Sequence, residues 1–224
     1  MLLDPQEWAQ IELLRGTPAE PLTAALLQRL LGPGDAFIDV GAHVGWLSLI
    51  AARAVGPSGA VLAIDPQPYN CDKILSNAAA NGFTQIVAVA CAVGEAPGLV
   101  RLASQPQSDR SRLTLAEPTG VNDTAQSFLA FVRTVPELME AAGLARAKAL
   151  KIDVEGFEPQ VLRGAAPVLA QIENIVFEAL PENPRAYDEA AALLTARGFE
   201  LVTVEGRPLE PAAAPERNVW ARRS

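Results

Sequence analysis

The sequence lacks the features of several large protein classes. No apolar run reaches the roughly 18 residues that a membrane-spanning helix needs, because Asp39, His43 and Arg53 interrupt the most apolar stretch. Residues 1–7 carry no basic charge ahead of an apolar segment, so we expect no signal peptide. The sequence therefore predicts a cytoplasmic protein with no membrane partner.

Basic residues and cysteines are also scarce. The chain has 18 lysines and arginines against 26 acidic residues, a net charge of −8, and its basic residues are scattered. We therefore expect no nucleic-acid partner and no contact with an anionic membrane surface. Cys71 and Cys91 fall in segments predicted to be buried or helical, so two free thiols are expected rather than a disulfide.

What the sequence does contain is an alternation of short apolar strands and helices. Strands are predicted at 37–40, 60–64, 86–92, 149–153, 175–178, 199–204 and 217–222, and helices at 23–31, 44–55, 68–81, 135–143, 158–171 and 184–197. This order predicts an α/β fold with a mostly parallel sheet, right-handed crossovers and helices on both faces.

Two segments stand apart from this alternation. Residues 1–34 are predicted to form an N-terminal arm and a helix ahead of a single domain at 35–224. Residues 94–133 are polar and rich in turns, and a connection of this length is usually functional or mobile. We interpret 94–133 as an insertion, with 104–127 as a flexible cover over an acceptor pocket.

The most informative stretch, residues 37–48, is a strand followed by a glycine turn and a helix. A dinucleotide fingerprint has three glycines, as G-x-G-x-x-G, whereas this turn has only Gly41 and Gly45. The spacing favours S-adenosylmethionine (SAM), whose amino-acid end binds backbone amides and carries no pyrophosphate. Gly41 would allow a ligand to approach closely, with Ala42 and His43 beside it. The alternative is an ordinary core strand and turn.

Carboxylates end several predicted strands, and ligands of open α/β sheets bind at that edge. Asp65 follows Gly41 by 24 residues, close to the separation at which an acidic residue binds a ribose diol. Its alternative role is to cap the helix that starts near Pro66. Asp39 is expected either to accept backbone N–H groups of the glycine turn or to hold the ammonium group of SAM. Further cofactor contacts are expected from Pro66, from Ala92 at the end of the third predicted strand, and from Asp153.

The second informative stretch is Lys151-Ile-Asp-Val-Glu-Gly-Phe-Glu158. Asp153 ends one strand and Glu178 ends the next, so their carboxylates can face one pocket and either share a proton or bind a cation. Glu155 and Asp153 would point to opposite faces if the strand continued, and they converge if the chain bends at Gly156. Glu158 is better explained by the following helix N-terminus.

The identity of the general base is open between Asp153 and His43, with Glu178 bonding the acceptor. His43 is the only histidine, and its alternative role is a loop residue bonded to backbone. A metal-free site is favoured over one that holds Mg²⁺.

Together these segments resemble the FkbM family of SAM-dependent methyltransferases. The matching pieces are I-D-V-G-A-H-V-G-W-L-S-L (38–49), I-D-P-Q-P (64–68), N-A-A-A-N-G (77–82), A-C-A-V-G (90–94), L-K-I-D-V-E-G-F-E (150–158), V-L-R-G-A (161–165) and I-V-F-E (175–178). The resemblance implies a class I, Rossmann-like fold with seven strands, the last of them antiparallel. It also implies SAM as cofactor.

The sequence departs from that family at three places. The family usually has asparagine at the position of His43 and glutamate at that of Asp65, and an expected Thr-Leu-Asp element reads Thr134-Val-Pro136. Acceptor identity is therefore not carried over from the resemblance.

The function predicted is methylation of a hydroxyl on a small natural product or sugar. The alternatives are N-methylation of a peptide or amide, and a SAM-binding partner subunit without activity. A nicotinamide oxidoreductase is disfavoured by the missing middle glycine. The oligomeric state is open, with a homodimer among the options.

Overall fold

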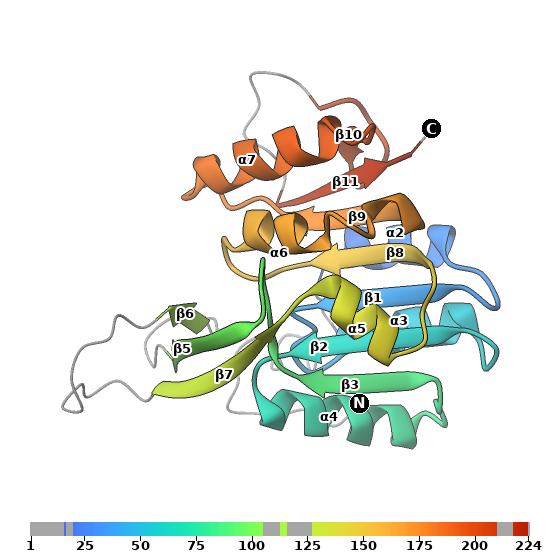
Figure 1. Cartoon of the computed structure of the whole chain (residues 1–224). Helices are drawn as coiled ribbons and strands as arrows, with labels where there is room; N and C mark the ends of the chain where they lie inside the picture. The colour runs from blue at the N-terminus through green and yellow to red at the C-terminus, as the bar shows by residue number, and fades with distance from the viewer. Residues whose placement is uncertain (1–15, 17–19, 105–112, 116–126, 210–216, 224) are drawn as a thin grey trace.

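The computed structural model describes residue 16 and residues 20–104, 113–115, 127–209 and 217–223. A seven-stranded sheet runs through the centre, in the order β10-β11-β9-β8-β1-β2-β3 (Figure 1). Its strands are β1 (Ala36–Val40), β2 (Ala60–Asp65), β3 (Ile86–Ala90), β8 (Ala147–Ile152), β9 (Ile172–Glu178), β10 (Glu200–Thr203) and β11 (Asn218–Arg222). Neighbours pair in parallel except β11, which is antiparallel to both β9 and β10. The predicted seven-stranded fold with an antiparallel last strand is confirmed.

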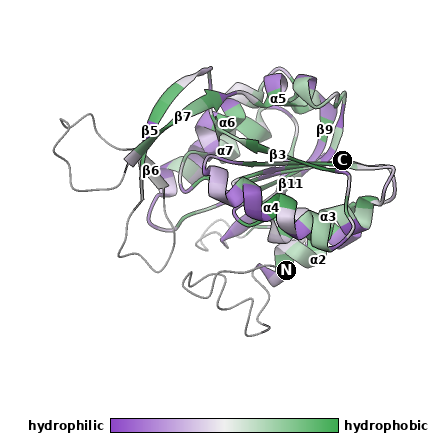
Figure 2. Cartoon of the chain, turned by 90° about the horizontal axis from the view of Figure 1, so that it is seen from below, coloured by the Kyte–Doolittle hydropathy of each residue, from purple (hydrophilic) through white to green (hydrophobic). Residues whose placement is uncertain are grey.

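Helices cover both faces of this sheet (Figure 2). One face carries α2 (Pro21–Leu30), α3 (Trp46–Val55) and α4 (Pro68–Ala80), and the other carries α5 (Val135–Ala141), α6 (Glu158–Ala165), the short 3-10 helix η1 (Leu169–Gln171) and α7 (Pro184–Thr195). Successive strand residues point to opposite faces. Phe37 of β1 accordingly packs in the core beneath α3, and Ile38 in the core that includes α6.

Most predicted elements are present, with two differences that have local causes. The predicted helix 158–171 ends at Ala165, because Pro167 cannot continue it, and η1 follows. The predicted strand 86–92 ends at Ala90, and Ala92 instead begins β4 (Ala92–Val93) of a second sheet. Thr134, in the element that departs from the family pattern, caps α5: its side chain accepts from the Glu137 N–H in a capping box.

The second sheet arises from the predicted insertion at 94–133. It has the strand order β4-β7-β5-β6, with β5 (Gly98–Ser104), β6 (Leu113–Leu115) and β7 (Ser127–Arg133). It projects from the edge of the central sheet at which the parallel strands end (Figure 1). The cover predicted at 104–127 lies mainly outside the described residues, and the domain division at residue 34 stays a prediction.

Two expectations based on scarce features can be compared with the structure. Cys71 and Cys91 are buried and free, as predicted, and burial raises the pKa of each thiol to about 11. In the part of the chain that the structure describes, no helix is long and apolar enough to cross a membrane.

The packing of α6 against the turn after β4 supports a test of the fold. A Cβ on Gly164 would lie 2.1 Å from the Gly94 carbonyl oxygen, a backbone atom that cannot move aside locally. We expect Gly164→Ala to lower the free energy of unfolding by about 1–3 kcal/mol, as overpacking does. Gly98→Ala is the control, because a Cβ there meets nothing within 4 Å. Equal stability of both variants in urea denaturation would contradict this packing.

Candidate cofactor and acceptor site

The glycine turn joins three strands at the carboxyl edge of the sheet. The N–H groups of Gly41 and Ala42 both donate to the Ile64 carbonyl, at 2.9 and 3.0 Å. Gly41 has a φ of +82°, and a Cβ there would lie 1.8 Å from the carbonyl oxygen of Asp153. The sequence predicted that the missing side chain admits a ligand, but the structure places the backbone of Asp153 at that position.

The second glycine has the role that the sequence predicted. Gly45 is the N-cap residue of α3, with a φ of +85°. A Cβ on it would lie 2.9 Å from Cγ1 of Ile74, so the missing side chain lets the start of α3 pack tightly on α4. The first N–H groups of α3 have no partner within the helix and are suited to a carboxylate.

Asp65, buried at the end of β2, bonds to both flanking loops. Its Oδ2 accepts the backbone N–H of His43 at 3.0 Å, and its Oδ1 accepts from the Gln67 N–H and the Asn70 Nδ2, each at 2.9 Å. The alternative prediction, that Asp65 caps α4, is wrong: the N-cap residue is Gln67, and no described side chain caps that helix. A carboxylate oxygen can accept two hydrogen bonds, which leaves Oδ2 able to accept one more.

His43 is held by its main chain. It is half-buried, has a φ of +50°, and donates its backbone N–H to Asp65. This agrees with the alternative of a loop residue bonded through its backbone, and a catalytic role stays a prediction.

Asp39, in β1 ahead of the turn, is bonded by a side chain of α3. It is 1% exposed, and its Oδ2 accepts from the Ser48 Oγ at 2.6 Å. The predicted bonds from backbone N–H groups of the glycine turn are absent among the described residues, and Ser48 of α3 is the bonded partner instead. Its Oδ1 is buried with no partner in that same part of the chain. The ammonium-binding alternative therefore stays open, and burial raises the pKa of Asp39.

Three carboxylates come together where β8 and β9 end. One oxygen each of Asp153, Glu155 and Glu178 lie within 4.8 Å of one another. The chain bends after β8 through two left-handed residues, Glu155 with a φ of +56° and Gly156 with a φ of +100°. The predicted convergence at Gly156 is therefore present, while the chemical roles of the three residues stay predictions.

Two cations that the sequence analysis missed meet this group. Lys151 is 3% exposed, and its Nζ lies 3.0 Å from Asp153 Oδ2 and 3.5 Å from Glu20 Oε1. Arg217 places its Nε 3.0 Å from Glu178 Oε1. The spacing of Lys151 and Asp153 in a strand puts both on one face, which was a usable signal. Arg217 and Glu20 have no such signal, because both are distant in sequence.

These contacts separate the acidities of the two strand-end carboxylates. Burial would raise the pKa of Asp153, but Lys151 outweighs it and holds that pKa below its usual range. Burial and the charges of Asp153 and Glu155 raise the pKa of Glu178 to about 9, against the opposing effect of Arg217. A pair with unlike acidities can hold one proton between them at neutral pH.

The remaining predicted residues contribute structure or have no contact that assigns a role. Glu158 accepts the N–H groups of Val154 and Gly156 at 3.1 and 3.2 Å, which confirms its predicted place at the start of α6. Pro66 and Ala92 are half-buried at the same edge of the sheet, and their predicted cofactor contacts stay predictions.

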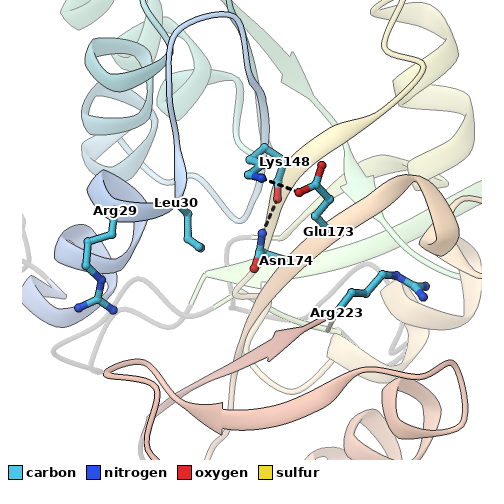
Figure 3. Close-up of a pocket in the computed structure, with 6 residues that line it drawn as sticks. All are labelled: Arg29, Leu30, Lys148, Glu173, Asn174 and Arg223. Atoms are coloured by element: carbon cyan, nitrogen blue, oxygen red, sulfur yellow. Dashed lines mark hydrogen bonds and ion pairs between the residues drawn. The ribbon is translucent and has the colours of Figure 1, made fainter.

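A cavity of about 540 Å³ lies away from this edge (Figure 3). Lys148 and Glu173, near the starts of β8 and β9, form an ion pair of 2.5 Å in its wall. Arg29 donates to the Val204 carbonyl and Arg223 to the Leu169 carbonyl. Its polar groups are thus engaged with the protein and lie at the opposite strand ends from Asp153, so this cavity is not the cofactor site.

Comparison with known proteins decides the family. The family model of the methyltransferase FkbM domain matches residues 39–201, which include the glycine turn and the carboxylates Asp153, Glu155 and Glu178. The chain belongs to the FkbM methyltransferase family. Among curated relatives, the 31-O-demethyl-FK506 methyltransferase FkbM of Streptomyces tacrolimicus is 29% identical over 198 residues, covering 77% of this chain and 75% of that protein. Methyltransferase 1 of Beauveria bassiana is 27% identical over 206 residues, which cover 84% of this chain and 77% of that protein.

Solved structures show the same fold. A putative methyltransferase of Streptococcus mutans in complex with SAH has a TM-score of 0.55 at 10% identity and covers 100% of both chains. The FkbM methyltransferase of Methylobacillus flagellatus has a TM-score of 0.54 at 15% identity, covering 94% of this chain and 57% of that one.

This FkbM methyltransferase therefore uses SAM, and its turn fits that cofactor. Asp39 offers an oxygen without a partner among the described residues, Asp65 can accept one further hydrogen bond, and the N-terminus of α3 begins at Gly45. An ammonium, a ribose hydroxyl and a carboxylate are the groups that these three features suit. Which atom of SAM each residue contacts remains a prediction.

Replacing Asp65 tests its contact with the cofactor. Asp65→Asn removes the charge and should weaken SAM by about 1.5–3 kcal/mol, the range for hydrogen bonds to charged groups. Asp72→Asn, on the exposed face of α4, is the matched control and should bind like wild type. Calorimetry with folded protein, checked by circular dichroism, measures both. An unchanged affinity in Asp65→Asn would remove this residue from the cofactor site.

The raised pKa of Asp65 predicts opposite pH effects on binding and stability. Burial, aided weakly by Asp39, raises this pKa from 3.8 to about 6 despite three hydrogen bonds. SAM affinity should fall below about pH 6, since the protonated carboxyl loses an acceptor. The folded state binds the extra proton, so this group's contribution to unfolding free energy is largest below about pH 4 and falls by up to about 3 kcal/mol as pH rises through 6.

The difference between wild type and Asp65→Asn isolates this group from other titrating residues. Urea denaturation and calorimetry at pH 4.5 to 7.5 should give a pH-dependent difference in both quantities. A difference that is constant over this range would contradict the raised pKa.

Proposed function

We propose that this chain methylates a hydroxyl group on a small acceptor that binds beside Asp153 and Glu178. The observation that supports this most is the pairing of a carboxylate held ionised by Lys151 with a neighbouring carboxyl of raised pKa. Bound SAM supplies an electrophilic methyl group. The protein's part is to bring the acceptor oxygen in line with that group and to accept its proton.

Asp153 is the better base of the two carboxylates. Its contact with Lys151 keeps it ionised, and its backbone adjoins Gly41 of the cofactor turn. The base is thereby next to the place where the methyl group would be presented. Glu178 is anchored through one oxygen by Arg217, which leaves the other to bond the acceptor.

A relative's chemistry supports oxygen as the acceptor atom. The Streptomyces tacrolimicus relative is a 31-O-demethyl-FK506 methyltransferase, a name that places the transferred methyl group on oxygen. No contact of the described residues favours an amide nitrogen. N-methylation and a partner subunit without activity are therefore outcomes of the tests below.

The role of Asp153 gives a kinetic prediction. Asp153→Asn should lower kcat by about 10²–10⁴-fold, the usual contribution of a positioned base, while the Kd of SAM stays within about twofold. Glu140→Gln, exposed on α5, is the control for a lost acidic charge. Methyl transfer is followed with radiolabelled SAM. Full activity in Asp153→Asn would exclude it as the base.

The acceptor class is tested without choosing a substrate. A metabolite extract is incubated with deuterated SAM and either wild type or Asp153→Asn, and labelled products are identified by mass spectrometry. Methyl ethers that appear only with wild type support the proposal. N-methyl products would replace it with amide methylation. SAM that binds but is never consumed would overturn the proposal and support the alternative of a partner subunit without catalytic activity.

A further inference from the structure

The acidic group at the ends of β8 and β9 contains an oxygen that the protein leaves unsatisfied. Glu178 has a side chain with 0% exposure, and only its Oε1 is paired, with Arg217. Its Oε2 is buried with no hydrogen-bond partner among the residues that the structure describes. A buried carboxylate oxygen without a partner costs free energy unless a ligand or a proton meets it.

The neighbours of Glu178 increase that cost. Asp153 and Glu155 each bring an oxygen to within 4.8 Å of the others, and like charges at this distance repel. Lys151 compensates only in part, because it is shared between Asp153 and Glu20. The chain adopts a left-handed conformation at Glu155, a non-glycine residue, where this carboxylate joins the group.

We propose that Asp153, Glu155 and Glu178 bind a divalent cation that prefers oxygen ligands, with Mg²⁺ as the natural ion. All three donors are carboxylates, and the described residues place no histidine or cysteine in the group. Such a ligand set suits a hard cation and disfavours zinc or copper. Lys151 donates to one oxygen of Asp153, and Arg217 donates to one oxygen of Glu178. These two bonds fix the direction of the other oxygen of each carboxylate, which would bind the ion.

The site would also restrict the acceptor, an inference that rests on the proposed function. Three protein oxygens leave coordination positions of an octahedral ion for water or substrate. An acceptor with two adjacent oxygens, such as a vicinal diol or a hydroxyl beside a carbonyl, would occupy two of them. With the ion bound, Glu178 would hold the acceptor through the ion and not directly, and the ion would lower the pKa of the hydroxyl whose proton Asp153 accepts.

The test measures cation binding before any activity. Chelator-treated protein without SAM or acceptor is titrated with Mn²⁺, and the free ion is followed by electron paramagnetic resonance. Wild type should bind one Mn²⁺ per chain, displaced by Mg²⁺. Glu155→Gln should weaken Mn²⁺ at least about tenfold, as loss of one of three charged ligands does. Glu140→Gln, the matched control, should bind like wild type.

Glu155→Gln is the primary variant because Glu155 is only half-buried, whereas Glu178→Gln would remove the ion-pair partner of Arg217. Circular dichroism checks that Glu155→Gln and the control Glu140→Gln are folded. No bound Mn²⁺ at millimolar concentration, or wild-type binding by folded Glu155→Gln, would overturn the cation site.

Activity then separates this inference from the proposed function. Methyl transfer that is unchanged after chelation overturns the cation's role and leaves hydroxyl methylation standing. Mn²⁺ that binds tightly in a protein that methylates no hydroxyl supports the site and removes the proposed function. Transfer only to acceptors with two adjacent oxygens, lost on chelation and restored by Mg²⁺, supports both.

Discussion

The contact between Gly41 and the backbone of Asp153 connects the two halves of the candidate site. The Asp153 N–H donates to the Val40 carbonyl at 3.0 Å, and its own carbonyl lies where a side chain on residue 41 would be. Any residue with a Cβ would push β1 and β8 apart at their carboxyl ends. Because the glycine turn follows β1 and the carboxylates Asp153 and Glu155 follow β8, this contact holds the two parts of the site next to each other.

Buried charge is the second constraint on the site. Placing Lys151 in the core costs several kcal/mol of desolvation unless acids meet it, and Asp153 and Glu20 do so. Glu20 precedes α2 and Asp153 follows β8, so Lys151 connects the start of that helix with the carboxylates at the strand ends. A structural protein would gain more stability from apolar residues of similar volume at these positions. The charge of Lys151 holds the pKa of Asp153 below its usual range, which is the property that the proposed function uses.

Asp65 shows how one carboxylate can serve structure and ligand binding together. Three hydrogen bonds hold it between the glycine turn and α4. The same bonds fix the direction of its remaining acceptor position. The sequence presented helix capping and ribose binding as alternatives. Asp65 does not cap α4, whose N-cap residue is Gln67, and its remaining acceptor position leaves ribose binding as the prediction.

The sequence by itself determined the order of strands and helices, the glycine turn and the strand-end carboxylates Asp65, Asp153 and Glu178. These follow from local patterns: apolar periodicity, glycine spacing and the alternation of side chains along a strand. Only the tertiary structure decided that Arg217 meets Glu178, that the chain leaves the sheet at Cys91, and that backbone fills the space beside Gly41. Each depends on strands distant in sequence becoming neighbours, and local periodicity carries no information about which strands those are.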